Sequence, residues 1–244
     1  MKIKNIFAFT LAEVLITLAI IGVVAALTIP QVINAYEKQA TINGLQKFYS
    51  TLNNVVKTAE AENGPHYYWT YYTGNTTIDT SNFVDTYILP YISYTKSCGY
   101  NKKPVQECLF NAQYKTYTQP DRTTPISINA VTCVSGGNGV NGGSGGCNYI
   151  MMNDGSLLAM EVRAFGGTGN GTLADGGCIQ FAVDINGPLK GPNSYGKDVF
   201  DCIYLFKSVN SLTSPSYICT LTDGGYCAGK IIYDGWQIKD DYPW

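Results

Sequence analysis

The chain has 244 residues, enough for one medium-sized domain with an appendage. Hydrophobic residues make up 45% of it and charged residues 14%, so the chain can bury a core and does not belong to the disordered class. The formal net charge of -2 brings no basic excess, and the composition therefore gives no support to a nucleic-acid-binding function.

The chain begins with a short basic leader and a long apolar run. Lys2 and Lys4 lie in the leader, residues 1–8, and place it on the cytoplasmic side of a membrane. Residues 9–29 contain a single charge, Glu13, and at ~1.5 Å per helical residue this run is long enough to span a bilayer. We predict a single-pass helix in the cytoplasmic (inner) membrane, followed by an extracytoplasmic head.

Three other interpretations of the apolar run remain open. A conventional signal peptide cut after Ala26 would have an apolar region longer than the usual ~7–15 residues, and that region would contain a carboxylate. A plain signal anchor accounts for the length but not for Glu13, since burying a carboxylate at a helix centre costs on the order of 2.5–3.5 kcal/mol. A buried core helix of a soluble protein is disfavoured because the run is apolar on every face.

The residues at the start of the apolar run form a short motif, in which Ala8 is followed by Phe9-Thr10-Leu11-Ala12-Glu13. The motif resembles the prepilin cleavage and methylation site of type IV pilins and type II secretion pseudopilins, with Ala8 in place of the usual glycine. The resemblance implies that a prepilin peptidase cuts after Ala8 and methylates the new amine of Phe9. Glu13 and Pro30 then stand where these families carry a glutamate and often a proline.

The same resemblance implies assembly into a filament with other pilin or pseudopilin subunits, on an inner-membrane assembly platform. Glu13 would meet the amine of Phe9 in a neighbouring subunit. An ion pair in a dry filament core offsets the desolvation of both groups only when the geometry is good, so we expect it to set register rather than stability. From the residues alone, Glu13 is also explained by a side chain that reaches the membrane surface.

From residue 30 to residue 63 the pattern stays helical and becomes amphipathic. Apolar residues near i, i+3, i+4 and i+7 spacing predict one buried face, made of Tyr36, Ala40, Leu45, Phe48, Tyr49, Leu52, Val55, Val56 and Ala59. Gly64-Pro65 predicts the end of the helix, and Pro30 is a place where it could bend or unwind. We expect this stalk to pack on a head domain of residues 64–244.

The head reads as a helix and a set of strands, which predicts an α+β fold with an antiparallel sheet. Aromatic residues of loop 66–80 either form a binding surface or pack on the stalk, and Ser81 predicts the cap of a helix ending near Pro90. Asn153-Asp154-Gly155 predicts a hairpin turn. We expect strands at 126–134, 147–152, 157–162, 178–185 and 199–206, a Gly-rich loop at 136–146, and a short helix at 228–234. Trp236 and Trp244 either dock on the sheet or belong to an outward-facing tail.

All eight cysteines lie between Cys98 and Cys227. An even number in an exported chain favours disulfides, and zinc is weakly supported because His66 is the single histidine. Many pairings are possible. We predict pairs of sequential neighbours, the third because its cysteines lie on two strands that can place them face to face: Cys98–Cys108, Cys133–Cys147, Cys178–Cys202 and Cys219–Cys227.

The stretch 184–198 is rich in turn residues, with Asp184-Ile185-Asn186-Gly187, Gly191-Pro192-Asn193 and Gly196-Lys197-Asp198. It resembles a strand-connecting loop of pilin-like heads, and some pseudopilins bind calcium in this region. Asp184, Asn186 and Asp198 supply oxygen ligands that suit calcium, the one cofactor that the resemblance suggests. Alternatively, the two carboxylates accept hydrogen bonds from turn amides.

The sequence offers no recognisable catalytic set, since His66 has no serine or cysteine nucleophile in a suitable context, and we expect the protein not to be an enzyme. We predict a structural subunit of a type IV pilus or of a type II secretion pseudopilus. The alternatives are a minor tip pilin or adhesin that binds a surface, a secreted substrate or DNA, and a membrane-anchored exported domain that never assembles.

Overall fold

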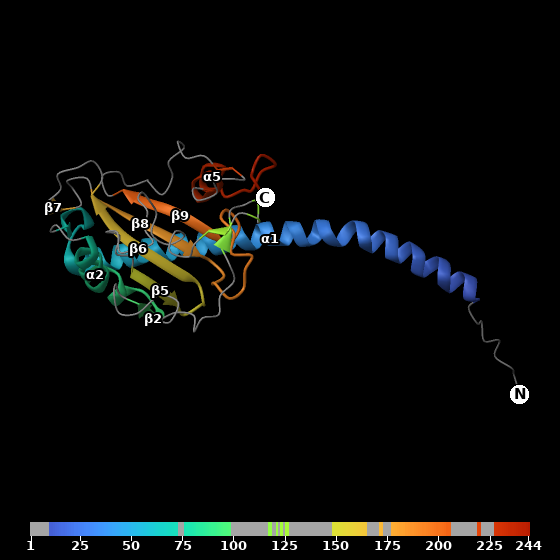
Figure 1. Cartoon of the computed structure of the whole chain (residues 1–244), viewed down its shortest axis with the longest axis horizontal. Helices are drawn as coiled ribbons and strands as arrows, with labels where there is room; N and C mark the ends of the chain where they lie inside the picture. The colour runs from blue at the N-terminus through green and yellow to red at the C-terminus, as the bar shows by residue number, and fades with distance from the viewer. Residues whose placement is uncertain are drawn as a thin grey trace, which may run out of the picture. The chain divides into compact units, whose positions relative to one another are not determined.

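The structure is a computed structural model of the whole chain (Figure 1). It describes residues 10–72, 76–98, 117–118, 121, 123, 125–126, 148–164, 171–172, 177–205, 219–220 and 227–244. The chain divides into two compact parts, Met1–Ala40 and Thr41–Trp244, and each is described by itself. We call the second part the head.

One helix, α1 (Leu11–Asn63), contains most of the apolar run and the whole amphipathic stretch. It continues through Pro30 without unwinding, and Gly64, with a φ of 78°, follows its last residue. A residue in the left-handed region ends many helices, and glycine adopts that conformation without steric cost. The prediction of a single helix ending at Gly64-Pro65 is confirmed.

A five-stranded antiparallel sheet forms the centre of the head, in the spatial order β2-β5-β6-β8-β9. Its strands are β2 (Tyr94–Cys98), β5 (Asn148–Met152), β6 (Leu157–Ala164), β8 (Gly177–Asp184) and β9 (Val199–Leu205). Two small ladders pair β1 (Thr70–Tyr72) with β7 (Gly171–Thr172), and β3 (Tyr117–Thr118) with β4 (Pro125–Ile126). The predicted α+β class and antiparallel sheet are confirmed.

Four sheet strands agree with the sequence prediction to within two residues, and the turn at Asn153-Asp154-Gly155 joins β5 to β6. β2 was not predicted, because three of its five residues are exposed and polar side chains interrupt any apolar alternation. Of the strand expected at 126–134, residue 126 lies in β4. The rest of it and loop 136–146 lie outside the described residues.

The helices of the head are η1 (His66–Tyr68), α2 (Thr76–Tyr87), η2 (Leu89–Tyr91) and α5 (Cys227–Tyr233). The prediction that Ser81 begins the second helix was wrong. Thr80 is fully buried, and its hydroxyl accepts a hydrogen bond from Val162 N–H (3.2 Å), so a tertiary contact holds the first turns of α2. A local capping signal carries no information about such a contact.

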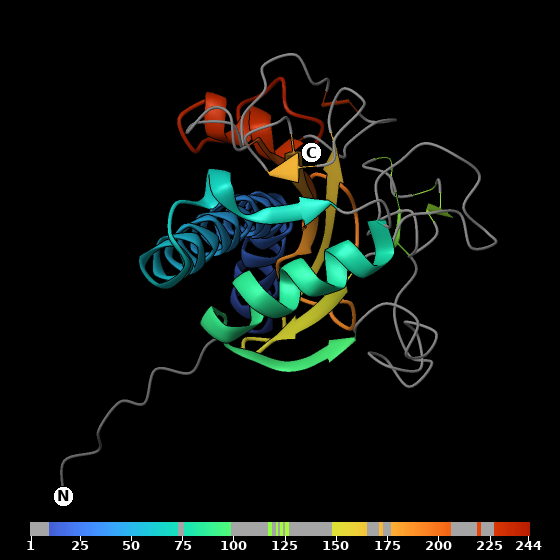
Figure 2. The same cartoon turned by 90° about the vertical axis from the view of Figure 1, so that its left-hand side faces the viewer.

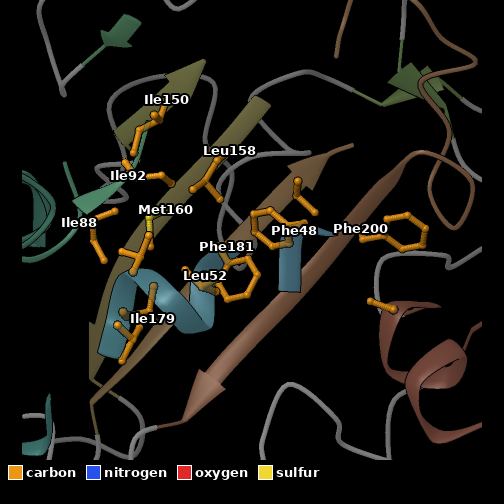
Figure 3. Close-up of a cluster of buried hydrophobic side chains, with 14 of the residues drawn as sticks. Phe48, Leu52, Ile88, Ile92, Ile150, Leu158, Met160, Ile179, Phe181 and Phe200 are labelled. Carbon is orange, nitrogen blue, oxygen red and sulfur yellow. The ribbon is translucent and has the colours of Figure 1, made fainter. Parts of the chain in front are cut away.

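The core lies between one face of the sheet and the helices (Figure 3). Phe48 of α1 packs on Phe181 of β8, with ring centroids 5.5 Å apart, and both are buried. In Figure 2 the strands are seen nearly edge on, with α1 on one side of them. The predicted stripe is buried from Leu45 onward except for Tyr49, which is half-buried, whereas Tyr36 is 74% exposed in the first part of the chain. The prediction that the buried stripe begins at Tyr36 was wrong.

Tyr68 and Trp69, which follow α1 closely, differ in burial. Trp69 is 2% exposed, stacks on Tyr87 with centroids 4.4 Å apart, and donates a hydrogen bond from Nε1 to the carbonyl of Gly64 (2.8 Å). Tyr68 is exposed. Trp69 thus packs in the core against α2 rather than on a binding surface, and its indole is not available to a ligand.

Candidate functional site

The first part of α1 presents apolar side chains to solvent on every side. In the most apolar 18-residue window the mean hydropathy is 2.4 and no residue is buried. Large aliphatic residues from Leu11 to Ile33 are between 42% and 78% exposed. A helix that is apolar all round is stable only when lipid or other protein surrounds it. By length and composition, this helix is able to cross a membrane.

The carboxylate in this segment closes the first turn of α1. Glu13 Oε2 accepts hydrogen bonds from Thr10 N–H (2.8 Å) and from the Thr10 hydroxyl (2.9 Å). In return, Glu13 N–H donates to Thr10 Oγ1 (3.3 Å). This reciprocal arrangement is a capping box, and its signature, Thr-x-x-Glu before an apolar run, is present in the sequence. Our sequence interpretation missed it. Ala8 and Phe9 lie outside the described residues.

Within the head, the start of the buried stretch of α1 contacts the β8–β9 loop (residues 185–198). The Thr41 hydroxyl donates a hydrogen bond of 2.6 Å to the carbonyl of Lys197, and Thr41 is buried. One turn later, Gly44 lies so close to Ile185 that a Cβ atom at residue 44 would be 2.9 Å from Ile185 Cδ1. The loop therefore fixes both the position and the spacing of α1 against the sheet.

The carboxylates of the predicted calcium site are used inside the loop itself. Asp184 Oδ1 accepts from Gly187 N–H (2.8 Å), and Asp198 accepts from Ser194 N–H (2.7 Å) and Asn193 N–H (2.8 Å). Asn186 Nδ2 also donates to Asp198 Oδ2 (3.2 Å). Burial raises the pKa of the Asp198 carboxyl above its usual value, although these donors act in the opposite direction.

These contacts match the interpretation in which Asp184 and Asp198 accept hydrogen bonds from turn amides. The loop thus brings Asp184, Asn186 and Asp198 together as predicted, since Asn186 bonds to Asp198 and its own N–H donates to Asp184 (3.3 Å). Among the described residues, no group of three or more Asp, Glu, His or Cys side chains is arranged to hold a metal ion. Calcium binding by Asp184, Asn186 and Asp198 stays a prediction.

One predicted disulfide is confirmed: Cys219 and Cys227 are bonded, with Cα atoms 4.8 Å apart. Cys98 is also disulfide-bonded, while Cys108, Cys133 and Cys147 lie outside the described residues. Cys178 and Cys202 lie on β8 and β9, the strands that flank the loop, as predicted, but the register does not place them directly opposite each other. The strand register pairs Cys178 with Leu205 and Cys202 with Phe181, so the two cysteines stand three positions apart along the ladder.

Comparison with known proteins gives one match. A family described as a family of unknown function (DUF6613) matches residues 31–117, which are 87 of the 244 residues. The match begins directly after Pro30 and includes the second half of α1, α2 and β2. No curated protein and no solved structure matches the chain. The function proposed below therefore depends on the residues and contacts of this chain.

Proposed function

We propose that the protein is a subunit of an extracytoplasmic filament of the type IV pilus or type II secretion kind, stored in the membrane and assembled through α1. The observation that carries this proposal is that the first part of α1 is apolar and exposed on every side, with Glu13 as its single carboxylate before residue 37. The resemblance of residues 8–13 to a prepilin cleavage site adds support.

The exposed helix has two environments in which it is stable, and the proposal uses both. In the membrane, about 20 apolar residues span the hydrocarbon core, a length that the segment from Leu11 to Pro30 provides. In a filament, the same surface would be covered by the corresponding helices of other subunits. Since lipid tails are as apolar as these side chains, transfer between the two environments involves little change in hydrophobic free energy.

The head supports such a role through its attachment to α1. Leu45, Phe48 and Leu52 are buried in the core, and Thr41 and Gly44 contact the β8–β9 loop. A force applied along α1 during assembly would therefore be resisted by core packing as well as by the covalent chain. A filament subunit that is pulled out of a membrane needs this property.

One observation favours a second candidate, a membrane-anchored exported domain that never assembles. The capping box gives Glu13 a role within its own helix, because Thr10 satisfies the carboxylate without a neighbouring subunit. An anchor helix with a well-capped first turn would show the same contacts. The minor-tip or adhesin alternative receives less support, since Trp69 is buried in the core.

The mature N-terminus and the location of the protein test the proposal. Membrane and sheared-surface fractions are collected, and the first residue is determined by mass spectrometry. We expect N-methylated Phe9 in both fractions, and filaments in the sheared one. A chain that begins at Met1 or at Leu27, or one that stays entirely in the membrane fraction, would refute filament assembly. Abundance then separates the two filament roles, because a shaft subunit dominates the sheared fraction and a tip subunit is rare.

A further inference from the structure

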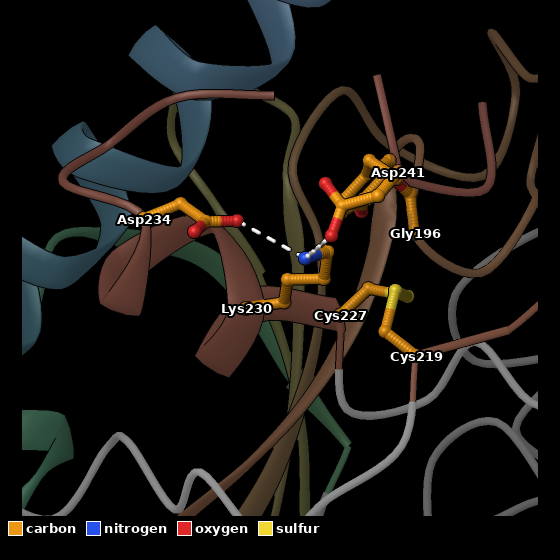
Figure 4. Close-up of a disulfide and its surroundings, with 7 residues drawn as sticks. Gly196, Cys219, Cys227, Lys230, Asp234 and Asp241 are labelled. Carbon is orange, nitrogen blue, oxygen red and sulfur yellow. Dashed lines mark hydrogen bonds and ion pairs between the residues drawn. A yellow bond between two sulfur atoms is a disulfide. The ribbon is translucent and has the colours of Figure 1, made fainter. Parts of the chain in front are cut away.

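The Cys219–Cys227 disulfide lies against the β8–β9 loop. Cys227 is the first residue of α5 and is fully buried, whereas Cys219 is partly exposed. Gly196 of the loop has a φ of 76°, and a Cβ atom at residue 196 would be 3.1 Å from Cys227 Sγ. Figure 4 shows Gly196 beside the disulfide. Only glycine fits a backbone of this conformation so close to the sulfur.

Residues 227–244 continue from this disulfide back to the same glycine. The Lys230 ammonium pairs with Asp241 (2.6 Å) and with Asp234 (3.1 Å), which ties α5 to the tail (Figure 4). Tyr242 follows Asp241 directly, is 5% exposed, and donates its hydroxyl hydrogen bond to the carbonyl of Gly196. We call Cys219 together with residues 227–244 the C-terminal strap.

The turn that the strap contacts is also the turn that holds α1. Lys197 follows Gly196, and its carbonyl accepts the hydrogen bond from the Thr41 hydroxyl (2.6 Å). The carbonyl of Ser194 accepts hydrogen bonds from the N–H groups of Lys197 (3.1 Å) and Val199 (3.2 Å). These bonds hold the turn as one unit, so its neighbouring residues move together. Displacement of Gly196 is therefore transmitted to the Lys197 carbonyl.

We infer that the Cys219–Cys227 disulfide is a redox-dependent fastening, which holds the C-terminal strap on the Gly196 turn and through that turn fixes the Thr41 end of the buried stretch of α1. An isolated helix of seven residues, the length of α5, is not stable in water, so α5 depends on its attachments. Without the disulfide, the ion pairs of Lys230 and the hydrogen bond of Tyr242 remain, but the first residue of α5 is no longer bonded to Cys219. The hold on α1 then weakens.

The partner required is a disulfide donor of the thiol–disulfide oxidoreductase or glutathione class. A thiolate of the strap attacks the donor disulfide and forms a mixed disulfide, and the second thiolate then displaces the donor sulfur. The two electrons end on the donor, which leaves as two thiols that carry the two protons. Cys219 is the partly exposed cysteine and is therefore the one that reacts first. This part rests on the proposed function, because an oxidising donor requires a head outside the cytoplasm.

Hydrogen exchange on the full, unassembled chain in mild detergent tests the fastening. In a Cys219→Ala/Cys227→Ala variant we expect the backbone amides of residues 41–48 and 194–198 to exchange about tenfold faster. A Tyr242→Phe variant keeps the disulfide and loses one hydrogen bond, so we expect the same amides to exchange about fivefold faster than in the unaltered chain. An Ile150→Val variant, a core change in β5, serves as the control and should not single out these amides.

The order of reaction is tested with oxidised glutathione on the single variants, read by peptide mass spectrometry. We expect Cys219 in Cys227→Ala to form its mixed disulfide at least tenfold faster than Cys227 in Cys219→Ala, since exposure controls access. Neither measurement involves filaments, so their outcome is independent of whether the protein assembles. Faster exchange confined to residues 227–244, with residues 41–48 unchanged in both variants, would overturn the inference.

Discussion

The hydrogen bond from Thr41 to the Lys197 carbonyl is the most sharply testable contact in the head. A Thr41→Val variant keeps the size and β-branching of the side chain and removes the hydroxyl. Threonine and valine have similar helix propensities, so the backbone of α1 contributes almost nothing to the difference. The change removes the Thr41 hydroxyl from a buried carbonyl that accepts its hydrogen bond, and we expect the free energy of unfolding to fall by about 1–2 kcal/mol.

Urea unfolding of the full chain in mild detergent, followed by tryptophan fluorescence, measures this loss. With a slope of ~2 kcal/mol per molar urea, the midpoint should fall by about 0.5–1 M. Thr58→Val is the matched control, because Thr58 lies on the same helix, is exposed, and donates to the carbonyl of Asn54 four residues earlier (2.8 Å). A loss in Thr41→Val no larger than that in Thr58→Val would show that the loop does not fix α1 through this bond.

Two further predictions concern the same region and are read by the same unfolding measurement. Helix propensity alone favours alanine over glycine by about 1 kcal/mol. Gly44→Ala should nevertheless not stabilise the head, because the new Cβ would lie 2.9 Å from Ile185 Cδ1. In an Ile185→Ala background, where that contact is absent, Gly44→Ala should raise the free energy of unfolding by about 1 kcal/mol. A gain from Gly44→Ala in the unaltered head would contradict the close approach. Burial alone would raise the pKa of Asp154, but Lys47 and the Ser156 donors outweigh it and hold that pKa below its usual value. The folded state therefore binds this proton less readily than the unfolded chain, so the Lys47–Asp154 pair stabilises the head above about pH 4, and its contribution disappears as pH falls through the folded pKa. Since both side chains are partly exposed, Lys47→Met should lower the free energy of unfolding by less than ~1 kcal/mol at pH 6, and by progressively less toward pH 3. A difference between the variant and the unaltered chain that grows on acidification would refute this.

The sequence predicts those elements whose stability comes from their own pattern. α1 carries an uninterrupted apolar run followed by an amphipathic stripe, and β6 and β8 carry dense apolar runs with turn residues at their ends. β2 could not be predicted from the sequence, because an exposed edge strand needs no apolar alternation. The start of α2 could not be predicted either, because a contact between Thr80 and Val162, 82 positions apart in the chain, holds its first turns.

The attachment of α1 to the loop could not be predicted from the sequence for a related reason. Thr41 and Lys197 are 156 positions apart, and nothing in either residue type specifies the other. The turn residues predicted a compact loop, and the acidic residues within it were interpreted as ligands or as acceptors of turn amides. Both interpretations place the same oxygens in the same loop. They differ only in which way the backbone N–H groups point, and that depends on the folded turn.

Glu13 is the residue at which the two candidate functions diverge, and two substitutions separate them. Glutamine at residue 13 still accepts hydrogen bonds from Thr10 and so preserves the capping box, but it has no charge to pair with the amine of a neighbouring subunit. Alanine removes both. If the ion pair is required for assembly, Glu13→Gln and Glu13→Ala should each lower the amount of subunit in sheared filaments at least tenfold, relative to the amount in the membrane. Glu37→Gln, an exposed change on the same helix, should leave that ratio unchanged. Filament yields for Glu13→Gln equal to those of the unaltered chain, with a loss in Glu13→Ala alone, would refute the ion pair and leave the helix cap as the sole role of this carboxylate.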